Sequence, residues 1–108
     1  MQHRILGVKV DEDTYNKYKA IILKRKKLLE KFHHERKQCM TLKSWLHRQK
    51  CYKKVRAKFS KLMTKNLTDE LHLMQQIALF AADVGLAFLV KRRILRISKR
   101  IANLADYI

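Results

Sequence analysis

The chain has 108 residues, of which 26 are lysine or arginine and nine are acidic, so its formal net charge is +17. This length allows one small domain with a modest core, and the charge favours an anionic partner such as nucleic acid or an anionic membrane surface. Proline is absent and glycine occurs twice, which argues against a turn-rich β fold, while a hydrophobic content of 47% argues against a wholly disordered basic tail.

The N-terminal residues predict a short strand followed by a helix. Alternation places two sets on opposite faces of the strand, namely Leu6, Val8 and Val10 against Ile5, Gly7 and Lys9. Asp11 stands where a helix N-cap is expected, with Glu12 and Asp13 in the first turn, where negative charge complements the helix dipole. The sequence therefore predicts that a helix begins directly after Asp11.

Apolar side chains at helical spacing predict that this first helix reaches residues 34–37. They are Tyr15, Tyr18, Ile22, Leu29 and Phe32. Arg25 occupies one expected position of the same apolar seam, and the other faces are mostly lysine. Thr41 is the next plausible N-cap, so we expect a second helix to open there.

The second predicted helix separates apolar from cationic side chains. At about 100° per residue, one broad face gathers Leu42, Trp45, Leu46, Tyr52, Val55, Phe59, Leu62 and Met63. The opposite face carries a narrow stripe, called the basic row here, made of Lys43, His47, Lys50, Lys54, Lys58, Lys61 and Lys65. Residues 36–68 contain eleven lysines and arginines and no acid. Like charges at these spacings cost about 0.2–0.5 kcal/mol per pair, a penalty that a bound anion would remove.

A break is predicted at residues 66–70, with Asn66 or Thr68 as the cap and Asp69 and Glu70 in the first turn of a third helix. That helix is expected to run to near the C-terminus. Its middle, residues 77–90, is apolar on nearly every side and is expected in the centre of an assembly. Asp83 is the lone charge there, and it either pairs with a basic side chain of another chain or carries function.

The last part of this helix shows a 3,4,3,4 apolar spacing typical of a seam with a partner helix, formed by Ile94, Ile97, Ile101, Leu104 and Ile108. Two regions are expected, a nucleic-acid-binding region over residues 1–65 and an oligomerisation or partner-binding helix over residues 66–108. The expected homo-oligomer, with a dimer favoured, uses Leu6, Val8, Val10, Ile94, Ile97, Ile101 and Leu104.

Two cysteines do not form a disulfide framework, and no signal peptide follows Met1, so we expect buried thiols in a reducing, cytoplasmic or nucleoid-associated setting. The candidate zinc ligands are His33, His34, Cys39, His47 and Cys51. The tight Cys-x-x-Cys spacing is missing, so no metal or other cofactor is expected. Trp45 and Phe59 are expected in the core, with the anchors of a calmodulin-type target helix as the alternative. No paired carboxylates, activated nucleophile or glycine-rich phosphate loop points to an enzyme.

The first fifty residues resemble the ribbon-helix-helix family of DNA-binding proteins. "RILGVKVDEDTYNKYKAI" is similar to that family's strand and first helix, and "TLKSWLHRQ" to the opening of its second helix. The resemblance implies that two chains pair their strands into a ribbon that enters the major groove. The strand side chains that face the DNA bases would then be Ile5, Gly7 and Lys9, with Arg4 and His3 nearby. The start of the second helix, at Thr41 and Leu42, would hold a phosphate through backbone amides.

The sequence therefore predicts a small, mostly α, oligomeric DNA-binding protein with one short strand and three helices, acting as a repressor or as an accessory factor in plasmid or viral DNA processing. Its predicted phosphate contacts are Arg4, Lys9, Thr41, Lys43, Lys50, Lys54, Lys58, Lys61 and Lys65. RNA is the other possible nucleic acid. The alternatives are a coat-like packaging protein, a ribonucleoprotein subunit, and a membrane-associated subunit in which residues 71–90 enter lipid.

Overall fold

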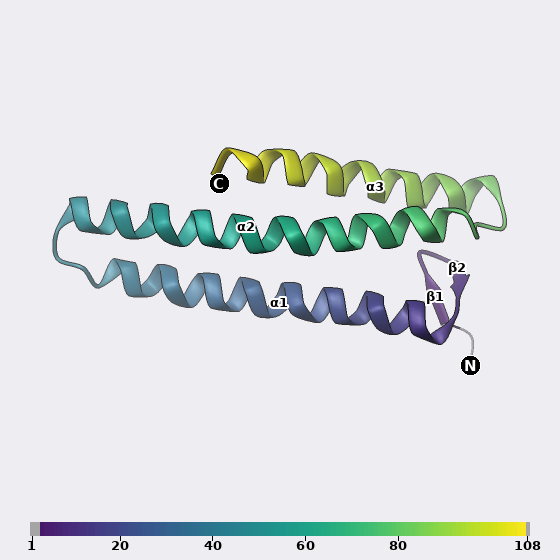
Figure 1. Cartoon of the computed structure of the whole chain (residues 1–108), viewed down its shortest axis with the longest axis horizontal. Coiled ribbons are helices and arrows are strands. Elements are labelled where there is room, and N and C mark those ends of the chain that lie inside the picture. The colour runs from purple at the N-terminus through teal and green to yellow at the C-terminus, as the bar shows by residue number, and fades with distance from the viewer. Residues whose placement is uncertain (1–2, 108) are drawn as a thin grey trace.

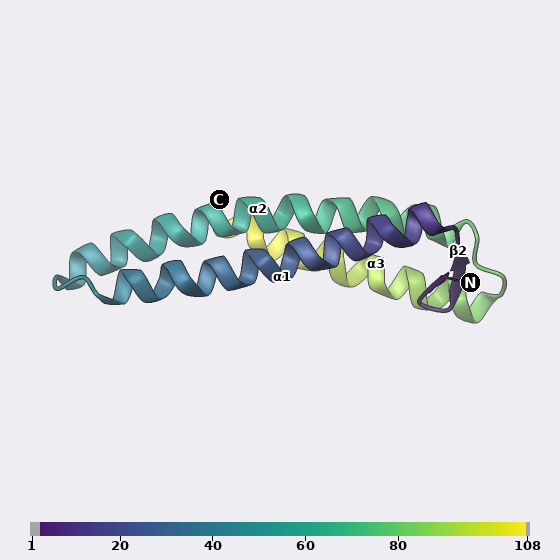
Figure 2. The same cartoon turned by 90° about the horizontal axis from the view of Figure 1, so that it is seen from below.

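The chain forms a rod of three long helices with a small hairpin at one end, in a computed structural model that describes residues 3–107. The elements are β1 (His3–Ile5), β2 (Val8–Val10), α1 (Glu12–Met40), α2 (Trp45–Ala78), α3 (Val84–Leu104) and a 3-10 turn, η1 (Ala105–Tyr107). The rod measures 57 × 27 × 16 Å. The α1–α2 pair extends past the C-terminal end of α3 (Figure 1; Figure 2), so one end of the rod is a two-helix hairpin. A mostly helical fold with three helices was predicted correctly.

The N-terminal stretch is a hairpin of two strands, where one continuous strand was predicted. Leu6 and Gly7 form the turn with φ of 51° and 83°, and Arg4 pairs with Lys9 and Ile5 with Val8 across the strands. A Cβ on Gly7 would lie 2.7 Å from Leu86 Cδ2, so this position favours glycine for its space as well as its φ.

The turn changes which hairpin side chains face the core. Ile5 and Val8 are buried in the core of their own chain, Val10 packs against that core, and Leu6 lies exposed at the turn. The predicted faces are therefore wrong, because a reversal at residues 6 and 7 replaces simple alternation. Ile5 does not point outward, and Val8 is not free to form an interface with a second chain.

Helix α1 begins where it was predicted to begin. Asp11 Oδ1 accepts a hydrogen bond from the Thr14 backbone N–H at 2.7 Å. The side chain of Thr14, together with this backbone bond, holds the pKa of Asp11 below its ordinary value. The helix runs to Met40, past the predicted end at residues 34–37. Contact with α2 continues over this extra length, because Cys39 is fully buried and is bonded to Cys51 of α2.

Thr41 ends α1 and does not open α2. Its hydroxyl donates to the Gln38 carbonyl oxygen at 2.7 Å, and Ser44 occupies the N-cap position of α2 without a side-chain capping bond. The predicted phosphate contact at Thr41 is therefore wrong, because its backbone N–H bonds back into the last turn of α1. Arg48 Nη1 closes the turn by donating to the carbonyl oxygens of Leu42 (2.8 Å) and Lys43 (3.3 Å).

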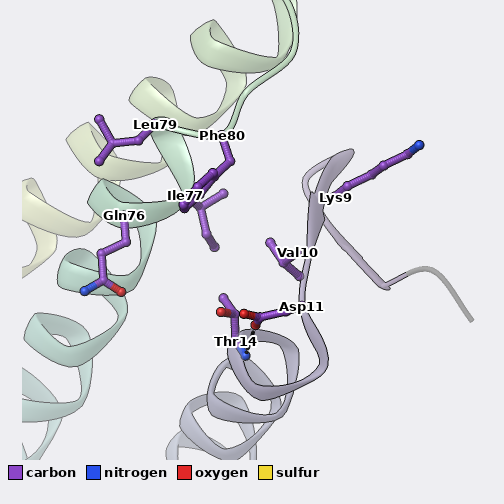
Figure 3. A pocket seen from close by; sticks show the side chains of 8 residues that line it. All are labelled: Lys9, Val10, Asp11, Thr14, Gln76, Ile77, Leu79 and Phe80. Atoms are coloured by element: carbon purple, nitrogen blue, oxygen red, sulfur yellow. Dashed lines mark hydrogen bonds between the residues drawn. The ribbon is translucent and has the colours of Figure 1, made fainter.

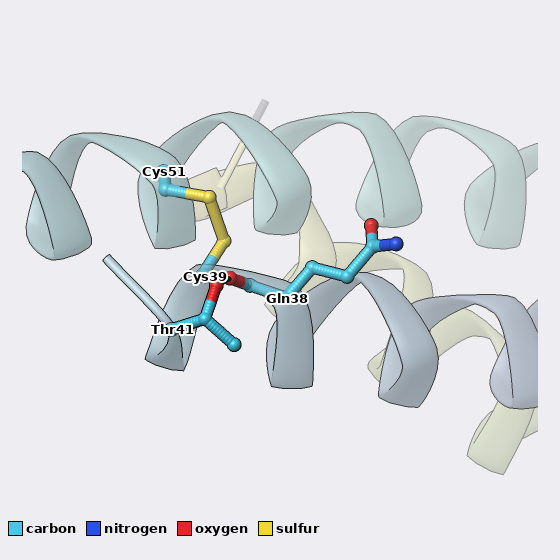
Figure 4. Close-up of a disulfide and its surroundings, with 4 residues drawn as sticks. All are labelled: Gln38, Cys39, Thr41 and Cys51. Atoms are coloured by element: carbon cyan, nitrogen blue, oxygen red, sulfur yellow. Dashed lines mark hydrogen bonds between the residues drawn. A yellow bond between two sulfur atoms is a disulfide. The ribbon is translucent and has the colours of Figure 1, made fainter.

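Cys39 and Cys51 form a disulfide that joins α1 to α2 beside this turn (Figure 4). The expectation of two buried thiols is wrong, because the antiparallel helix pair brings their Cα atoms to 5.6 Å, within the range that a disulfide needs. Disulfides persist mainly in oxidising compartments, so these cysteines no longer support a reducing one.

Helix α2 passes without interruption through the predicted break at residues 66–70. Asn66 and Glu70 are buried in its middle, where they face basic side chains from both neighbouring helices. Arg25 Nη2 of α1 lies 2.9 Å from Glu70 Oε1, and Arg93 of α3 donates to both Glu70 oxygens at 3.0 Å. Two of the predicted cap residues, Asn66 and Glu70, thus belong to a buried polar cluster, while Asp69 is exposed. The predicted boundary between residues 65 and 66 falls inside a helix.

The chain reverses between α2 and α3, at residues 79–83. Asp83 is the N-cap of α3, with its Oδ1 accepting from the Leu86 backbone N–H at 2.8 Å, a role that was not among those expected. The apolar stretch 77–90 therefore lies at the end of the rod and is not the middle of a helix (Figure 1). Within the described residues, no helix has the length and apolar character needed to cross a bilayer, and residues 71–90 are divided between two helices.

The apolar seam of α3 is used inside the chain. Ile97 is buried, and the side chains of Ile94, Ile101 and Leu104 pack on the common core with it, while Ile108 lies outside the described residues. The prediction that this seam meets a partner helix is wrong, because α2 of the same chain lies alongside α3 over this length (Figure 1; Figure 2). An interface between copies would therefore need another surface.

Candidate nucleic-acid interface

The basic row forms a continuous cationic surface along the outer side of α2. His47, Lys50, Lys54, Lys58, Lys61 and Lys65 lie on α2, while Lys43 lies in the turn before it, and all seven side chains are exposed. The opposite side of the helix faces inward, since Phe59 stacks on α1 and the Asn66 side chain donates to the Ile21 carbonyl oxygen at 2.9 Å. The predicted separation of lysines from apolar side chains is thus present in the fold.

Acidic side chains do little to neutralise this row. Among the described residues, Lys58 is the member of the row that has an ion-pair partner, with its Nζ 3.5 Å from Glu35 Oε1. The Lys58 side chain is 57% exposed, and an exposed pair of this kind contributes about 0–1 kcal/mol. Lys50, Lys54, Lys61 and Lys65 therefore present their charge to solvent.

A shallow open hollow of about 810 Å³ lies on the same side of α2, near the α1–α2 turn. Its cationic lining comes from Lys50, Lys53 and Lys54, with His47 beside them, and its apolar lining includes Leu42, Cys51 and Ala57. The sequence reasoning missed Lys53, because on a helical wheel it stands about 60° from Lys50 and outside the narrow stripe. The hollow can hold an anionic group among several ammonium groups at once.

Apolar side chains are exposed at the α1–α2 turn. Trp45 is 67% exposed, and Met40 and Leu46 are also exposed, so the prediction that Trp45 lies in the core is wrong. The physical reason is that α3 ends before it reaches this part of the α1–α2 pair (Figure 1). Phe59, further along α2, is half-buried against Phe32, as expected.

The predicted contacts on the N-terminal hairpin lie apart from the basic row. Arg4 and Lys9 are cross-strand partners and both are exposed, which places two cations side by side. The hairpin stands at the opposite end of the rod from the α1–α2 turn (Figure 1). The structure therefore divides the predicted nucleic-acid residues between a main surface on α2 and a small one on the hairpin.

The strands do not stand free for pairing in the way that the family resemblance implied. In that family, one strand from each of two chains forms the ribbon, whereas β1 and β2 here pair with one another within one chain. No family model, curated protein or solved structure matches the chain. Its interpretation therefore rests on its own geometry.

The described residues bring no three histidine, cysteine, aspartate or glutamate side chains together as a metal site would require. Cys39 and Cys51 are bonded to each other, so neither offers a thiolate ligand. What the surface does offer is a set of exposed ammonium groups in a line, which suits the oxygens of a polyanion.

Proposed function

We propose that this protein binds DNA through backbone phosphates, with the basic row on α2 as the contact surface. The observation that carries the proposal is the line of exposed lysines on one side of a single helix. Within the described residues, Lys58 is the lysine of this line that has an acidic partner. Lysine ammonium groups attract phosphates as point charges, and each neutralised phosphate releases condensed counterions.

The energetics support an anionic partner. From Lys50 to Lys65, successive row members stand three or four residues apart, and each like-charged pair at such spacing costs a helix about 0.2–0.5 kcal/mol. The part of the row from Lys50 to Lys65 covers about 22 Å of helix at 1.5 Å per residue, which is comparable to about six base-pair steps of duplex. Phosphates along this length would offset the repulsion among these lysines, because each ammonium group would lie near a negative charge.

The geometry favours contact that does not depend on base sequence. Lysine side chains on a helix surface hold phosphates but carry no base readout by themselves, and the hairpin with Arg4 and Lys9 lies at the other end of the rod (Figure 1). Among the expected roles, coating or packaging of DNA is therefore better supported than site-specific repression. Footprinting on a long duplex checks this, since uniform protection agrees with packaging and one discrete protected site agrees with a repressor.

Salt-dependent binding tests the contact surface itself. Replacing Lys50, Lys54, Lys61 and Lys65 with glutamine should weaken binding to duplex DNA and reduce the slope of log affinity against log salt concentration by about 0.9 for each lost phosphate contact. Measurements with duplex DNA, single-stranded DNA and duplex RNA in the same salt series identify the preferred nucleic acid.

A matched control removes the same charge from another surface. Lys91, Arg92, Arg96 and Lys99 are exposed on α3, and replacing them with glutamine changes the net charge equally. If the α2 and α3 variants lose the same part of the salt slope, the attraction depends on net charge alone and the row is not the contact surface. A wild-type slope in the α2 variant would contradict the proposal outright.

A further inference from the structure

The end of the rod formed by residues 79–88 exposes a group of large apolar side chains, called the apolar end here. It consists of Leu79, Phe80, Val84 and Phe88, whose exposed fractions run from 62% for Phe88 to 86% for Val84. Leu79 and Phe80 follow the last turn of α2, while Val84 and Phe88 stand one helical turn apart at the start of α3. Monomeric proteins seldom leave a contiguous apolar surface of this kind uncovered.

A hollow of about 530 Å³ lies beside these side chains, between the hairpin and the end of α2 (Figure 3). Val10, Asp11 and Thr14 border it from the hairpin side, and Gln76, Ile77, Leu79 and Phe80 border it from α2. Ile77 is almost fully buried and offers an apolar floor. The apolar end thus combines protruding side chains with a recess next to them.

Charge distinguishes this end from the rest of the molecule. Residues 71–90 contain no lysine or arginine, and four of the nine acidic residues lie at this end, namely Asp11, Glu12, Asp13 and Asp83. Arg4 and Lys9 of the hairpin add positive charge beside them. The surface is therefore of mixed sign, while the basic row lies toward the other end of the rod.

We infer that the apolar end is where a second copy of this chain docks. In a symmetric pair the same surface faces itself, so each copy supplies both the protruding side chains and the recess. Two chains of net charge +17 repel least where four of the nine acids gather and where residues 71–90 carry no lysine or arginine. The carboxylates of one copy can also face Arg4 and Lys9 of the other. An anionic bilayer would instead meet those same carboxylates, which disfavours lipid as the occupant.

This inference does not depend on DNA binding, so the test contains no nucleic acid. Sedimentation equilibrium of the full chain over a range of concentrations, in enough salt to screen the basic row, should show a mass that rises to twice the 13.0 kDa of one chain. The double variant Phe80→Ser and Phe88→Ser should stay at 13.0 kDa over the same range. Its dimer dissociation constant should be at least about tenfold higher than that of wild type, because the aromatic anchors of the interface are removed.

Leu46→Ser is the matched control, because Leu46 is an exposed apolar side chain at the opposite end of the rod. It should associate like wild type, and unchanged circular dichroism should show that all variants fold. A monomeric wild type at every concentration, a double variant that still associates, or a Leu46→Ser variant that dissociates would each overturn the inference. A wild-type monomer that floats with vesicles of anionic phospholipid would overturn it in favour of lipid.

Discussion

Arg25 of α1 and Glu70 of α2 form a buried ion pair, with Arg25 Nη2 2.9 Å from Glu70 Oε1. Arg93 of α3 donates to the same carboxylate through Nε and Nη2 at 3.0 Å, and Arg25 Nε donates to Asn66 Oδ1 at 2.8 Å. One fully buried acid therefore joins all three helices. Because each partner sits at one position of its helix, sliding any helix by a turn would separate the charges, so we infer that the cluster helps to set the register.

Replacing Glu70 with alanine should destabilise the protein strongly. The change leaves two guanidinium groups facing each other without the carboxylate, and removing one partner of a buried pair typically lowers the free energy of unfolding by about 3–5 kcal/mol. Urea unfolding measures the difference. Asp69→Ala is the control, because this neighbouring acid is exposed, and it should change the free energy of unfolding by no more than about 0.5 kcal/mol. Equal effects would mean that the cluster adds nothing to stability.

The contribution of Glu70 should depend on pH. Burial alone raises the pKa of Glu70, but the hydrogen bonds and charges of Arg93 and Arg25 outweigh burial, so the pKa lies below its ordinary value of 4.5. Glu70 is therefore deprotonated in the folded protein at pH values where the unfolded chain already binds a proton there. Its stabilising contribution is complete above pH 4.5 and is lost as the pH falls through the lowered pKa of the folded state.

Comparison with Glu70→Gln isolates this contribution. The difference in unfolding free energy between wild type and this variant should be constant above the ordinary pKa and should narrow below it. The lowered pKa of Asp11 acts in the same direction, but it is common to both proteins and cancels in the difference. If this difference in unfolding free energy instead grows as the pH falls, the pKa of Glu70 is not lowered in the folded protein.

The disulfide should stabilise the turn between α1 and α2. Cys39 and Cys51 are 12 residues apart in the chain, and closing a loop of this size contributes about 2–4 kcal/mol to the free energy of unfolding. The double variant Cys39→Ser and Cys51→Ser should lose about that amount in urea unfolding. Wild type in reducing agent should then match the variant, and the variant should not respond to the reducing agent. A variant as stable as wild type would show that packing alone holds the turn.

The two proposals together predict that the protein bridges DNA. A pair joined at the apolar end carries two basic rows, so each pair can hold two separate duplexes. Wild type should retain a labelled duplex on beads that carry a different duplex, and Phe80→Ser with Phe88→Ser should lose this retention while its affinity for one duplex stays within about twofold. Full retention by the double variant would mean that bridging does not need the apolar end.

Local signals in the sequence were sufficient for part of the fold. Asp11 with Glu12 and Asp13 predicted the start of α1, and the separation of lysines from apolar residues predicted the outer face of α2. At residues 66–70 the same reasoning failed, because the residue types that form a cap signal can also lie inside a helix, where Asn66 and Glu70 belong to a buried polar cluster. Arg25, a cation in an apolar seam, was the sign that a buried acid would be needed.

The turn at residues 79–83 does have a signal in the sequence, which is an N-cap residue at its end. Asp83 stands directly before α3 and accepts from the Leu86 backbone N–H, as an N-cap does. The surrounding apolar run suggested an uninterrupted helix and concealed this cap. Once the break is placed there, Phe80 and Phe88 lie at the end of the rod rather than in its centre.

By itself, the sequence determined what depends on neighbours along the chain: long helices, the cap at Asp11, and the segregation of lysine from apolar side chains on α2. Only the tertiary structure decided what depends on distant partners, namely the Cys39–Cys51 bond, the cluster around Glu70, and the exposure of Trp45 and Phe80. The reason is physical. Periodicity reports which side chains share a face of a helix, whereas burial and pairing depend on which other helix lies against that face and on where that helix ends.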